Sequence, residues 1–406
     1  MRHEMAWAVW AVWAVGVLLA VAVPAAPALA LDSDPVWSNR EIAASNGDYT
    51  QHIGSDRYLA YDHYGTPGIV YQYTVNDFIF FRRRVEGTGW NTGMAFAGSP
   101  ATSPTLVYDR HERPVIGYVN QGATSLNQAG WDGTVWPVTS VHDDAQLHAS
   151  LALDLYGRMA MAWRGNTSEN VRFIHDTDGD GDWAEETVLT VGAGWTSYSY
   201  PRLAFDGLNR PVVAYCLDQG AVRSVAVHVQ DNGAWYSKIV VSDYTSYYNL
   251  SLAIDPASGY PALAYNNSSG DLSYAVWDND TAVWQITALG KGAQPSLAFD
   301  PADGAPAIAC TGDPGGNEFL ELYYWDSDDL TWREQAVDKE VDVGYAPSLA
   351  FNPYGDKPLG IAYFSMGGTL YYIQDPPVVP EPATMALLLA GLGACALNRS
   401  RRRRQS

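Results

Sequence analysis

The chain of 406 residues is poor in charge and in cysteine. Charged residues make up 17% of it, and only three residues are cysteines. A disulfide framework is therefore not expected, and Cys216 and Cys310 are predicted to be small buried residues. Positive charge is the scarcer sign, because 24 Lys and Arg stand against 45 Asp and Glu, a formal net charge of −21. A polyanion such as a nucleic acid is a poor partner for such a body.

Glycine, proline and aromatic residues are plentiful instead. The chain holds 37 Gly, 23 Pro, 26 Tyr and 15 Trp, and 47% of its residues are hydrophobic. Coiled coils are rich in Ala, Glu, Lys and Leu, and disordered chains lack apolar residues, so both classes are excluded. The composition indicates a β-rich globular protein with many turns.

The N-terminus has the pattern of a secretory signal peptide. Arg2 precedes an apolar run over residues 5–23, and Ala28-Leu29-Ala30 supplies the small-x-small cleavage pattern. We predict that residues 1–30 are a signal peptide cleaved after Ala30. The apolar run has 19 residues, longer than the usual ~7–15, so an uncleaved membrane anchor is the alternative.

The C-terminus combines three features in a fixed order. Pro380-Glu381-Pro382 is followed by apolar or small residues over 383–397 and then by four arginines at 401–404. The apolar segment is shorter than the ~20 residues of a usual membrane-spanning helix. An arginine cluster favours the cytoplasmic side of a membrane. A transmembrane helix that inserts transiently is therefore predicted for this tail, and a frayed basic tail is the alternative.

Residues 380–382, the apolar segment and the arginine run together resemble the PEP-CTERM sorting signal of Gram-negative bacteria. The resemblance covers about 25 residues and is specific. It implies an inner-membrane precursor, recognition by an exosortase and the export machinery, removal of the tail, and release or attachment at the cell surface. It also implies a host that makes exopolysaccharide.

A motif of the form Leu-small-apolar-Asp occurs seven times between the two ends. Its copies are 45 to 52 residues apart. They are Leu59-Ala60-Tyr61-Asp62, Leu106-Val107-Tyr108-Asp109, Leu151-Ala152-Leu153-Asp154, Leu203-Ala204-Phe205-Asp206, Leu252-Ala253-Ile254-Asp255, Leu297-Ala298-Phe299-Asp300 and Leu349-Ala350-Phe351-Asn352.

Each copy is followed by a turn, an apolar run, an alternating run and a last run that begins near a tryptophan. Four short antiparallel strands in this length match a propeller blade of ~40–50 residues. The sequence therefore predicts an all-β fold, a seven-bladed β-propeller over residues 31–375, followed by a sorting tail over 376–406. The repeats resemble those of bacterial surface propellers, which are loosely sialidase-like, and that resemblance implies the fold more than an activity.

The last repeat has only three strands, ending at residues 370–373. The missing strand is predicted at residues 36–42, which resemble the fourth run of other repeats, as at Trp284 and Trp332. An N-terminal strand would complete the last blade and cover an edge that is otherwise open. A linear β-solenoid, the alternative, has no reason to supply a strand at its front and omit one at its back.

An acidic loop is the strongest candidate metal site. Asp176, Asp178, Asp180 and Asp182 alternate with other residues, and glycines allow the backbone to turn around one point. Carboxylate oxygens in such a loop suit Ca²⁺. The loop resembles calcium loops of the Asp-x-Asp-x-Asp-Gly kind but lacks their distal glutamate. An elaborated hairpin turn is the alternative, because acidic turns occupy the same place in other repeats.

Aromatic residues gather in two successive connections between repeats. Trp195, Tyr198, Tyr247 and Tyr248 present flat apolar rings with polar edges, which suit sugar surfaces. We predict that they bind polysaccharide on the face away from the acidic turns. Packing between blades is the alternative for these rings.

No catalytic residue is predicted. The run Arg82-Arg83-Arg84 lies in one strand, so its side chains point alternately to opposite faces, and it is interpreted as a solvated strand end. His111, His142, His148 and His175 are scattered and are expected at the surface. The predicted function is a secreted, surface-sorted binding or extracellular-matrix module for polysaccharide. A glycoside hydrolase or lyase on a sialidase-like propeller, and a purely structural surface protein, are the alternatives.

Overall fold

The structure, a computed structural model, describes residues 37–374. Gaps in this description fall at residues 38–39, 46, 48–56, 74–76, 92–93, 97–100, 147, 166–169, 180, 190–195, 198–199, 220–221, 242–249, 268, 313–317, 341 and 354–358. The side chains of 94–96, 196–197, 219 and 222 are also outside it. The predicted signal peptide and sorting tail lie outside the described residues. No described segment forms a helix long and apolar enough to cross a membrane.

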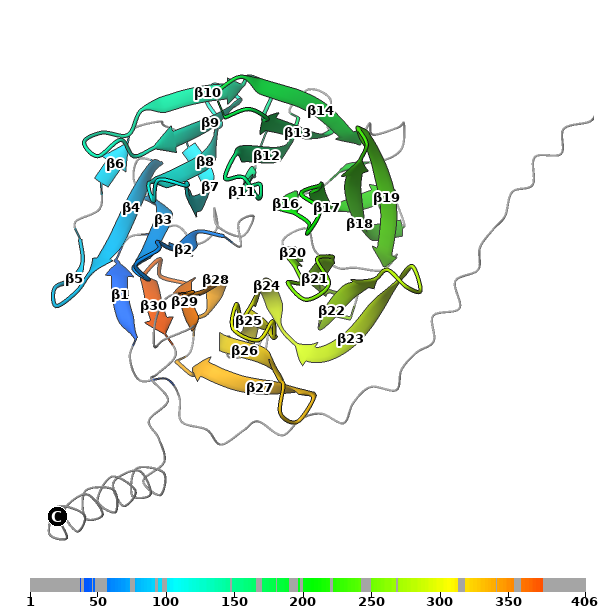
Figure 1. The fold of residues 1–406 in the computed structure, drawn as a ribbon. Coiled ribbons are helices and arrows are strands. Elements are labelled where there is room, and N and C mark those ends of the chain that lie inside the picture. Colours follow the sequence, from blue (N-terminus) through cyan, green and yellow to red (C-terminus); the bar gives the residue numbers. More distant parts are fainter. Residues whose placement is uncertain are drawn as a thin grey trace, which may run out of the picture.

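The described chain forms seven antiparallel sheets arranged in a ring, and none of it is helical (Figure 1). This is a seven-bladed β-propeller with four strand positions in each blade, as the repeats predict. Blades are numbered 1 to 7 in the chain order of their inner strands. All seven motif copies lie at inner strands, which are β2 (Leu59–Tyr61), β7 (Ala101–Tyr108), β11 (Ser150–Leu153), β16 (Arg202–Phe205), β20 (Leu250–Ile254), β24 (Ala293–Phe299) and β28 (Tyr345–Phe351).

The second and third strands of each blade follow as hairpins. The second strands are β3 (Pro67–Tyr73), β8 (Pro114–Asn120), β12 (Met159–Arg164), β17 (Pro211–Gln219), β21 (Pro261–Asn266), β25 (Pro306–Gly312) and β29 (Leu359–Phe364). The third strands are β4 (Phe78–Val85), β9 (Ser125–Gly130), β13 (Val171–Asp176), β18 (Val222–Asp231), β22 (Asp271–Asp278), β26 (Phe319–Asp326) and β30 (Leu370–Gln374).

Outer strands complete the blades. They are β5 (Gly89–Trp90) with β6 (Met94–Phe96), β10 (Val138–His142), β14 (Trp183–Leu189), β19 (Ala234–Val241), β23 (Val283–Lys291), β27 (Thr331–Asp338) and, for blade 7, β1 (Glu41–Ala44). Two blades carry an additional piece. Blade 1 has its outer strand in two parts, and blade 4 has a short strand, β15 (Thr196–Ser197), that pairs with β17 beside β16.

Burial falls from the second strand to the outer strand. Every residue of β21 is buried, whereas no residue of β23 is. The core consists of apolar clusters between neighbouring blades, such as the one that joins Val212 of blade 4 to Leu252 and Leu263 of blade 5. Both faces of β21 are therefore buried, because its side chains pack alternately against the blade before and the blade after.

The aspartate that ends the repeat motif shapes the turn that follows it. The Oδ1 atom of Asp154 accepts hydrogen bonds from the backbone N–H groups of Tyr156 at 2.8 Å and Arg158 at 2.9 Å, and its Oδ2 atom pairs with the Arg158 guanidinium. Gly157 supplies the positive φ of 76° that this turn needs. Asp109 and Asp206 hold their turns with the same pattern. The motif aspartate therefore shapes the turn after the inner strand in blades 2, 3 and 4.

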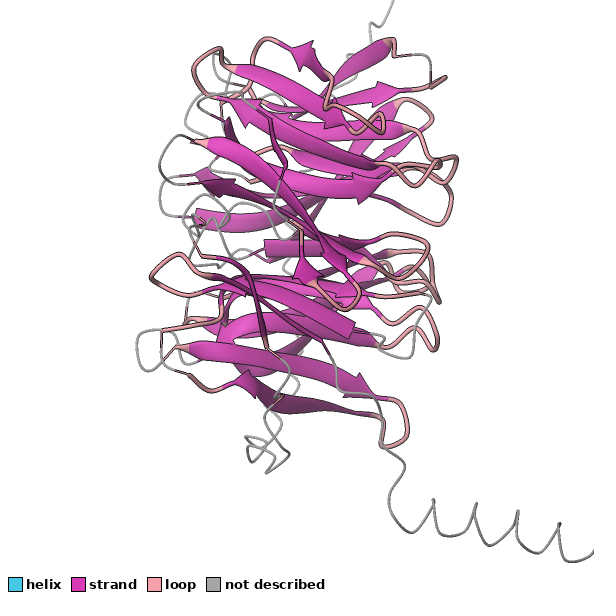
Figure 2. Cartoon of the chain, turned by 90° about the vertical axis from the view of Figure 1, so that its left-hand side faces the viewer, coloured by secondary structure: helices cyan, strands magenta, loops and turns pink. Residues whose placement is uncertain are grey.

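These turns define two faces of the ring. The hairpins after the inner and third strands lie together on one side, here called the turn face, and Figure 2 shows described loops gathered there at the right. The connections after the second and outer strands belong to the opposite face.

Serines in the inner strands fasten successive blades. The Ser150 Oγ accepts the backbone N–H of Leu203 at 3.0 Å, which ties blade 3 to blade 4. Ser251 and Ser296 make the same contact with the inner strand of the next blade. Ser348 closes the ring, because its Oγ accepts the N–H groups of Tyr58 and Leu59, both at 3.1 Å.

The N-terminal strand completes blade 7 as predicted, but its position differs. β1 pairs antiparallel with β30, with Glu41 opposite Tyr372. The expected strand over residues 36–42 is wrong in its bounds, since β1 spans Glu41–Ala44. Arg40, just before β1, turns its guanidinium to Asp338 and Glu340 next to it in blade 6. Trp37 is instead buried in the core cluster shared by blades 6 and 7.

Candidate functional site

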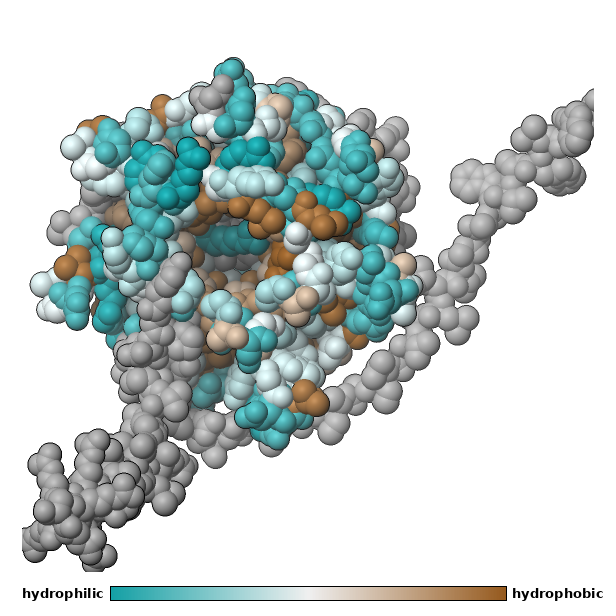
Figure 3. Space-filling view, viewed as in Figure 1, coloured by the Kyte–Doolittle hydropathy of each residue, from teal (hydrophilic) through white to brown (hydrophobic). Residues whose placement is uncertain are grey.

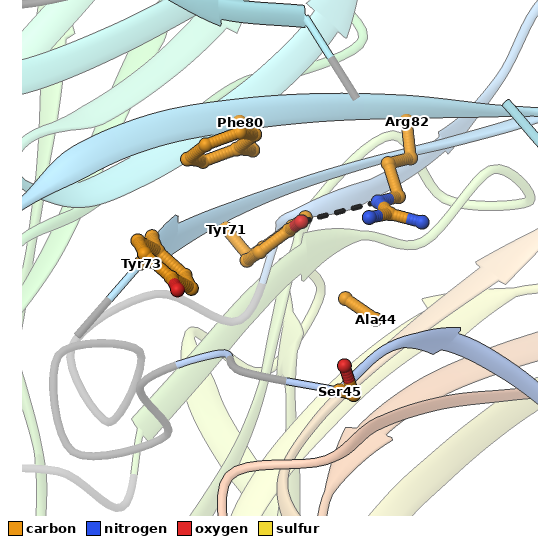
Figure 4. Close-up of a pocket in the computed structure, with 6 residues that line it drawn as sticks. All are labelled: Ala44, Ser45, Tyr71, Tyr73, Phe80 and Arg82. Atoms are coloured by element: carbon orange, nitrogen blue, oxygen red, sulfur yellow. Dashed lines mark hydrogen bonds between the residues drawn. The ribbon is translucent and has the colours of Figure 1, made fainter. Parts of the chain in front are cut away.

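A pocket of about 300 Å³ lies where the ring closes, between blade 7 and blade 1. It is here called the seam pocket (Figure 4), and its lining residues are Ala44, Ser45, Tyr71, Tyr73, Phe80 and Arg82. The first two come from the end of β1, and the others come from β3 and β4. Strand β3 starts after a turn-face hairpin and ends at Tyr73, so the pocket lies towards the opposite face.

Three aromatic rings form one wall of the seam pocket. Tyr71 is paired with Phe80 across β3 and β4, and their ring planes lie 20° apart with centroids 5.6 Å apart. The Tyr73 ring meets Phe80 edge-on at 5.5 Å. Tyr71 is buried, whereas Tyr73 and Phe80 remain partly exposed. The wall therefore offers partly open aromatic surface held in a fixed arrangement by the packed Tyr71.

Arg82 brings a positive charge to this wall. Its Nε donates a hydrogen bond to the Tyr71 hydroxyl at 3.1 Å, and its guanidinium carbon lies 5.9 Å from the Tyr71 ring centroid. Burial raises the pKa of Tyr71 above its ordinary value. The hydroxyl therefore stays protonated and serves to orient the arginine. Figure 4 shows the guanidinium beside the tyrosine oxygen.

The neighbouring arginines have carboxylate partners. Arg83 pairs with Asp62 on the turn side of blade 1, and Arg84 pairs with Glu41 of β1 at 2.6 Å. The interpretation of this run as a solvated strand end is wrong for Arg82 and Arg84, which are half-buried. The reason is that Glu41 of β1 binds Arg84, and the residues at the end of β1 line the same pocket as Arg82.

A second cavity, of about 500 Å³, occupies the central channel. Its walls are inner-strand residues such as Leu59, Ile254 and Phe299, and its described lining includes no carboxylate. Arg57 reaches across the ring and donates to the backbone carbonyls of Leu203 and Leu252 in blades 4 and 5. Figure 3 shows the hollow at the centre of the ring with hydrophobic residues around it. Converging carboxylates, which a hydrolase would need, are not found among the described lining residues.

The predicted sugar-binding aromatics lie outside the described residues. This applies to Trp195, Tyr198, Tyr247 and Tyr248. Two facts concern their surroundings. Residues 196–197 were expected within a connection but form β15, and the nearby Tyr200 packs its ring 3.6 Å from the ring of His148.

The acidic loop is described in part. The Oδ1 atom of Asp176 accepts hydrogen bonds from the N–H groups of Gly179 at 2.9 Å and Gly181 at 3.3 Å, so this carboxylate shapes the turn. Asp180 is outside the described residues, whereas Asp178 and Asp182 are inside it. Among described residues, no group of three or more His, Cys, Asp or Glu is placed to hold a metal ion.

The histidine and cysteine expectations have mixed outcomes. His148 was expected at the surface, but only 7% of it is exposed and its Nδ1 lies 2.5 Å from the Ser103 Oγ. Burial lowers the pKa of His148 well below its ordinary value, so it is neutral. Cys216 and Cys310 are free and buried, as predicted.

Sequence reasoning missed the seam pocket and its residues. One signal was available, because the third run of blade 1 contains three consecutive arginines, Arg82-Arg83-Arg84, and no other third run does. The sequence does not show that this run faces Ser45 and the end of β1, since those residues belong to another blade.

Comparisons with known proteins locate a motif and a fold. Residues 378–404 match the PEP-CTERM protein-sorting motif. The sequence matches no curated protein. Among solved structures, a lectin from Burkholderia pseudomallei is 12% identical with a TM-score of 0.60, over 79% of this chain and 98% of the lectin. An ulvan lyase from a new family of polysaccharide lyases is 12% identical with a TM-score of 0.58, over 82% of this chain and 95% of the lyase.

Such low identities show the fold alone. The sorting motif indicates export and surface sorting through processing of the C-terminus. The chain thus joins a seven-bladed β-propeller to a C-terminal PEP-CTERM sorting motif.

Proposed function

We propose that this protein is a surface-sorted propeller that binds extracellular polysaccharide without catalysis, and that the seam pocket is a binding site. One observation carries the proposal: partly exposed rings of Tyr73 and Phe80 stand beside a hydroxyl and a guanidinium in one pocket. Sugars offer flat C–H surfaces edged by hydroxyl groups. Aromatic rings with a few placed polar groups are the usual lining of ligand pockets.

The sorting motif supports the location of this function. Exosortase and the export machinery are the proposed partners of the tail, with a signal peptide at residues 1–30 and an inner-membrane precursor. A protein released or attached at the surface meets extracellular polysaccharide directly. The lectin and the polysaccharide lyase of similar fold are proteins of sugar recognition and sugar cleavage, which agrees with this class of ligand.

The seam pocket favours binding over the alternative of a hydrolase or lyase. Glycoside hydrolases generally need a pair of carboxyl groups flanking the bond to be cleaved. Among the described residues, the lining of the seam pocket includes no Asp or Glu. A lyase needs a base to remove a proton from the sugar, and the raised pKa of Tyr71 keeps that hydroxyl protonated.

A binding experiment with three variants tests the site. The exported protein, purified from an exosortase-positive host, is titrated with the polysaccharide of that host. Loss of one stacked ring is worth about 1.4 kcal/mol, so Tyr73→Ala and Phe80→Ala should each weaken binding about tenfold. Tyr64→Ala is the matched control, because Tyr64 is a 73% exposed tyrosine on the turn face.

Equal binding by all three variants, at unchanged melting temperature, would remove the seam pocket from the proposal. Release of unsaturated sugar ends, followed by ultraviolet absorbance, would instead show a lyase. Mass spectrometry of the same material should find no peptide beyond about Pro382, and recovery of the intact arginine run would contradict processing of the tail.

A further inference from the structure

Arg82 occupies a position that every other blade fills with a buried residue. It pairs with Ile69, the third residue of the second strand. The residues paired with the third residue of the second strand in blades 2 to 7 are Ala129, Ile174, His228, Ala275, Tyr323 and Ile373. All six are buried, whereas Arg82 is half-exposed. The charge therefore belongs to this seam alone and not to the repeat.

The contacts of Arg82 leave one end of its guanidinium open to the pocket. Its Nε is held by the Tyr71 hydroxyl. In the described part of the chain it pairs with no carboxylate, although Arg83 and Arg84 on the same strand both do. A guanidinium held at Nε presents its terminal nitrogens as a fixed pair of donors, which matches two oxygens of a carboxylate or a sulfate.

We propose that the seam pocket recognises an acidic sugar, with the terminal nitrogens of Arg82 on its carboxylate or sulfate and the rings of Tyr73 and Phe80 against its apolar face. The inference rests on the proposed function and names its ligand class. Tyr71 is the positioning residue, because it orients Arg82 and packs against Phe80. A sugar carboxylate and a sugar sulfate share the chemistry that Arg82 would recognise, because each presents a pair of anionic oxygens on a sugar ring.

The charge of the whole chain limits how dense the acidic sugars can be. A net charge of −21 repels a polymer that carries a charge on every unit. Such repulsion acts over about 8 Å at physiological salt, whereas contact with Arg82 is local. The expected ligand is therefore a chain in which an acidic sugar alternates with neutral ones.

Four probe polymers show whether the recognised anion is a carboxylate or a sulfate. Hyaluronan alternates an uronate with a neutral sugar, and carboxyl-reduced hyaluronan is its neutral counterpart. Dextran sulfated on a minority of its glucose units, and unmodified dextran, form the matching pair for sulfate. The exported protein should prefer an acidic probe to its neutral counterpart, and comparison of the two pairs shows whether a carboxylate or a sulfate is recognised.

Variants at Arg82 test the contact itself. Arg82→Gln should weaken binding of the preferred acidic probe about 10- to 100-fold, as for loss of a charged hydrogen bond, and leave the neutral probe within about twofold. Arg82→Lys should fall between the two, because it keeps the charge and loses the paired donors. Arg110→Gln is the matched control, since Arg110 is exposed on the turn face and its Nε donates to the neighbouring His111.

The failures of the two proposals are distinguishable. Equal binding of acidic and neutral probes, with the same modest effect of Arg82→Gln on both, would overturn the acidic specificity and leave polysaccharide binding in place. An equal loss in Arg82→Gln and Arg110→Gln would show that only net charge matters and would overturn it too. No binding of any probe or of host polysaccharide by the parent protein would overturn both proposals.

Discussion

An ordinary seam of the ring and the closing seam solve the same packing problem with different means. Between blades 5 and 6, the Ser251 Oγ accepts the N–H of Leu297, and an apolar cluster joins the buried Leu272 of blade 5 to Ile308 of blade 6. At the closing seam, Ser348 accepts two N–H groups, and ion pairs such as that of Arg84 with Glu41 join the blades.

The difference follows from how each seam is connected. Successive blades of a repeat are joined by the chain, which keeps them close while apolar packing and inner-strand serines hold them together. The closing seam joins residues about 290 positions apart, such as Ser348 with Tyr58 and Leu59. Bringing such distant segments together costs chain entropy, which extra polar contacts help to offset. This is also the seam where the repeat is broken and where the pocket lies.

Removal of the closing strand β1 should have the largest effect on stability, and it tests whether the closing seam depends on that strand. Deletion of residues 1–45 removes β1, the contacts of Arg40 and Glu41, and the buried Trp37. The loss in free energy of unfolding should exceed the ~3–5 kcal/mol that truncation of one buried aromatic costs. Deletion of residues 1–36 is the control and should melt like the processed parent. Equal melting of the two deletions by calorimetry would contradict closure by β1.

The serines allow the two seams to be compared atom for atom. Ser296→Ala should cost about 1–3 kcal/mol, because it leaves the buried N–H of Leu349 without its partner. Ser348→Ala leaves two N–H groups, of Tyr58 and Leu59, and should cost up to about twice as much. Denaturant unfolding measures both values. A smaller loss for Ser348→Ala than for Ser296→Ala would show that the closing seam is not specially fastened.

The turn after the third strand of blade 3 has more aspartates than the corresponding turns of other blades. We propose that the loop around Asp178, Asp180 and Asp182 binds calcium, which at a hundredfold excess over its dissociation constant adds about 2.7 kcal/mol to stability. EDTA should then lower the melting temperature, and Asp178→Asn with Asp180→Asn should abolish that response. Asp278→Asn with Asp280→Asn, in the plain turn of blade 5, is the matched control. Identical melting with and without EDTA would leave only the turn interpretation.

Acid should weaken an ordinary blade through a buried histidine. His228 of blade 4 lies against the Tyr215 hydroxyl at 2.8 Å, and burial lowers its pKa from 6.5 to about 4. The contribution of neutral His228 to the free energy of unfolding is complete above pH 6.5. It is lost as the pH falls towards 4, and about 2 kcal/mol is lost by pH 5. Stability measured against pH should be flatter in His228→Asn than in the parent. An unchanged slope would assign the acid response to other groups.

The site itself was only partly open to prediction. The acidic turns follow from short patterns, and the tail motif was recognised from Pro380-Glu381-Pro382, whereas the predicted aromatic residues lie outside the described structure. The seam pocket was not, because Ser45 and Arg82 lie in different blades. His148 was misplaced for a similar reason, since its burial depends on Ser103 and Tyr200 of neighbouring blades. A pattern within one repeat carries no information on contacts between repeats.

The sequence by itself determined the number of blades, the place of the inner strands and the closure by an N-terminal strand. It did so because each blade repeats one local pattern, from the Leu-small-apolar-Asp motif to the proline that starts most second strands. Only the tertiary structure decided where β1 pairs, how Arg57 crosses the channel and that Arg82 meets Tyr71 beside the end of β1. Those contacts depend on ring closure, which brings distant residues together by geometry that no local pattern encodes.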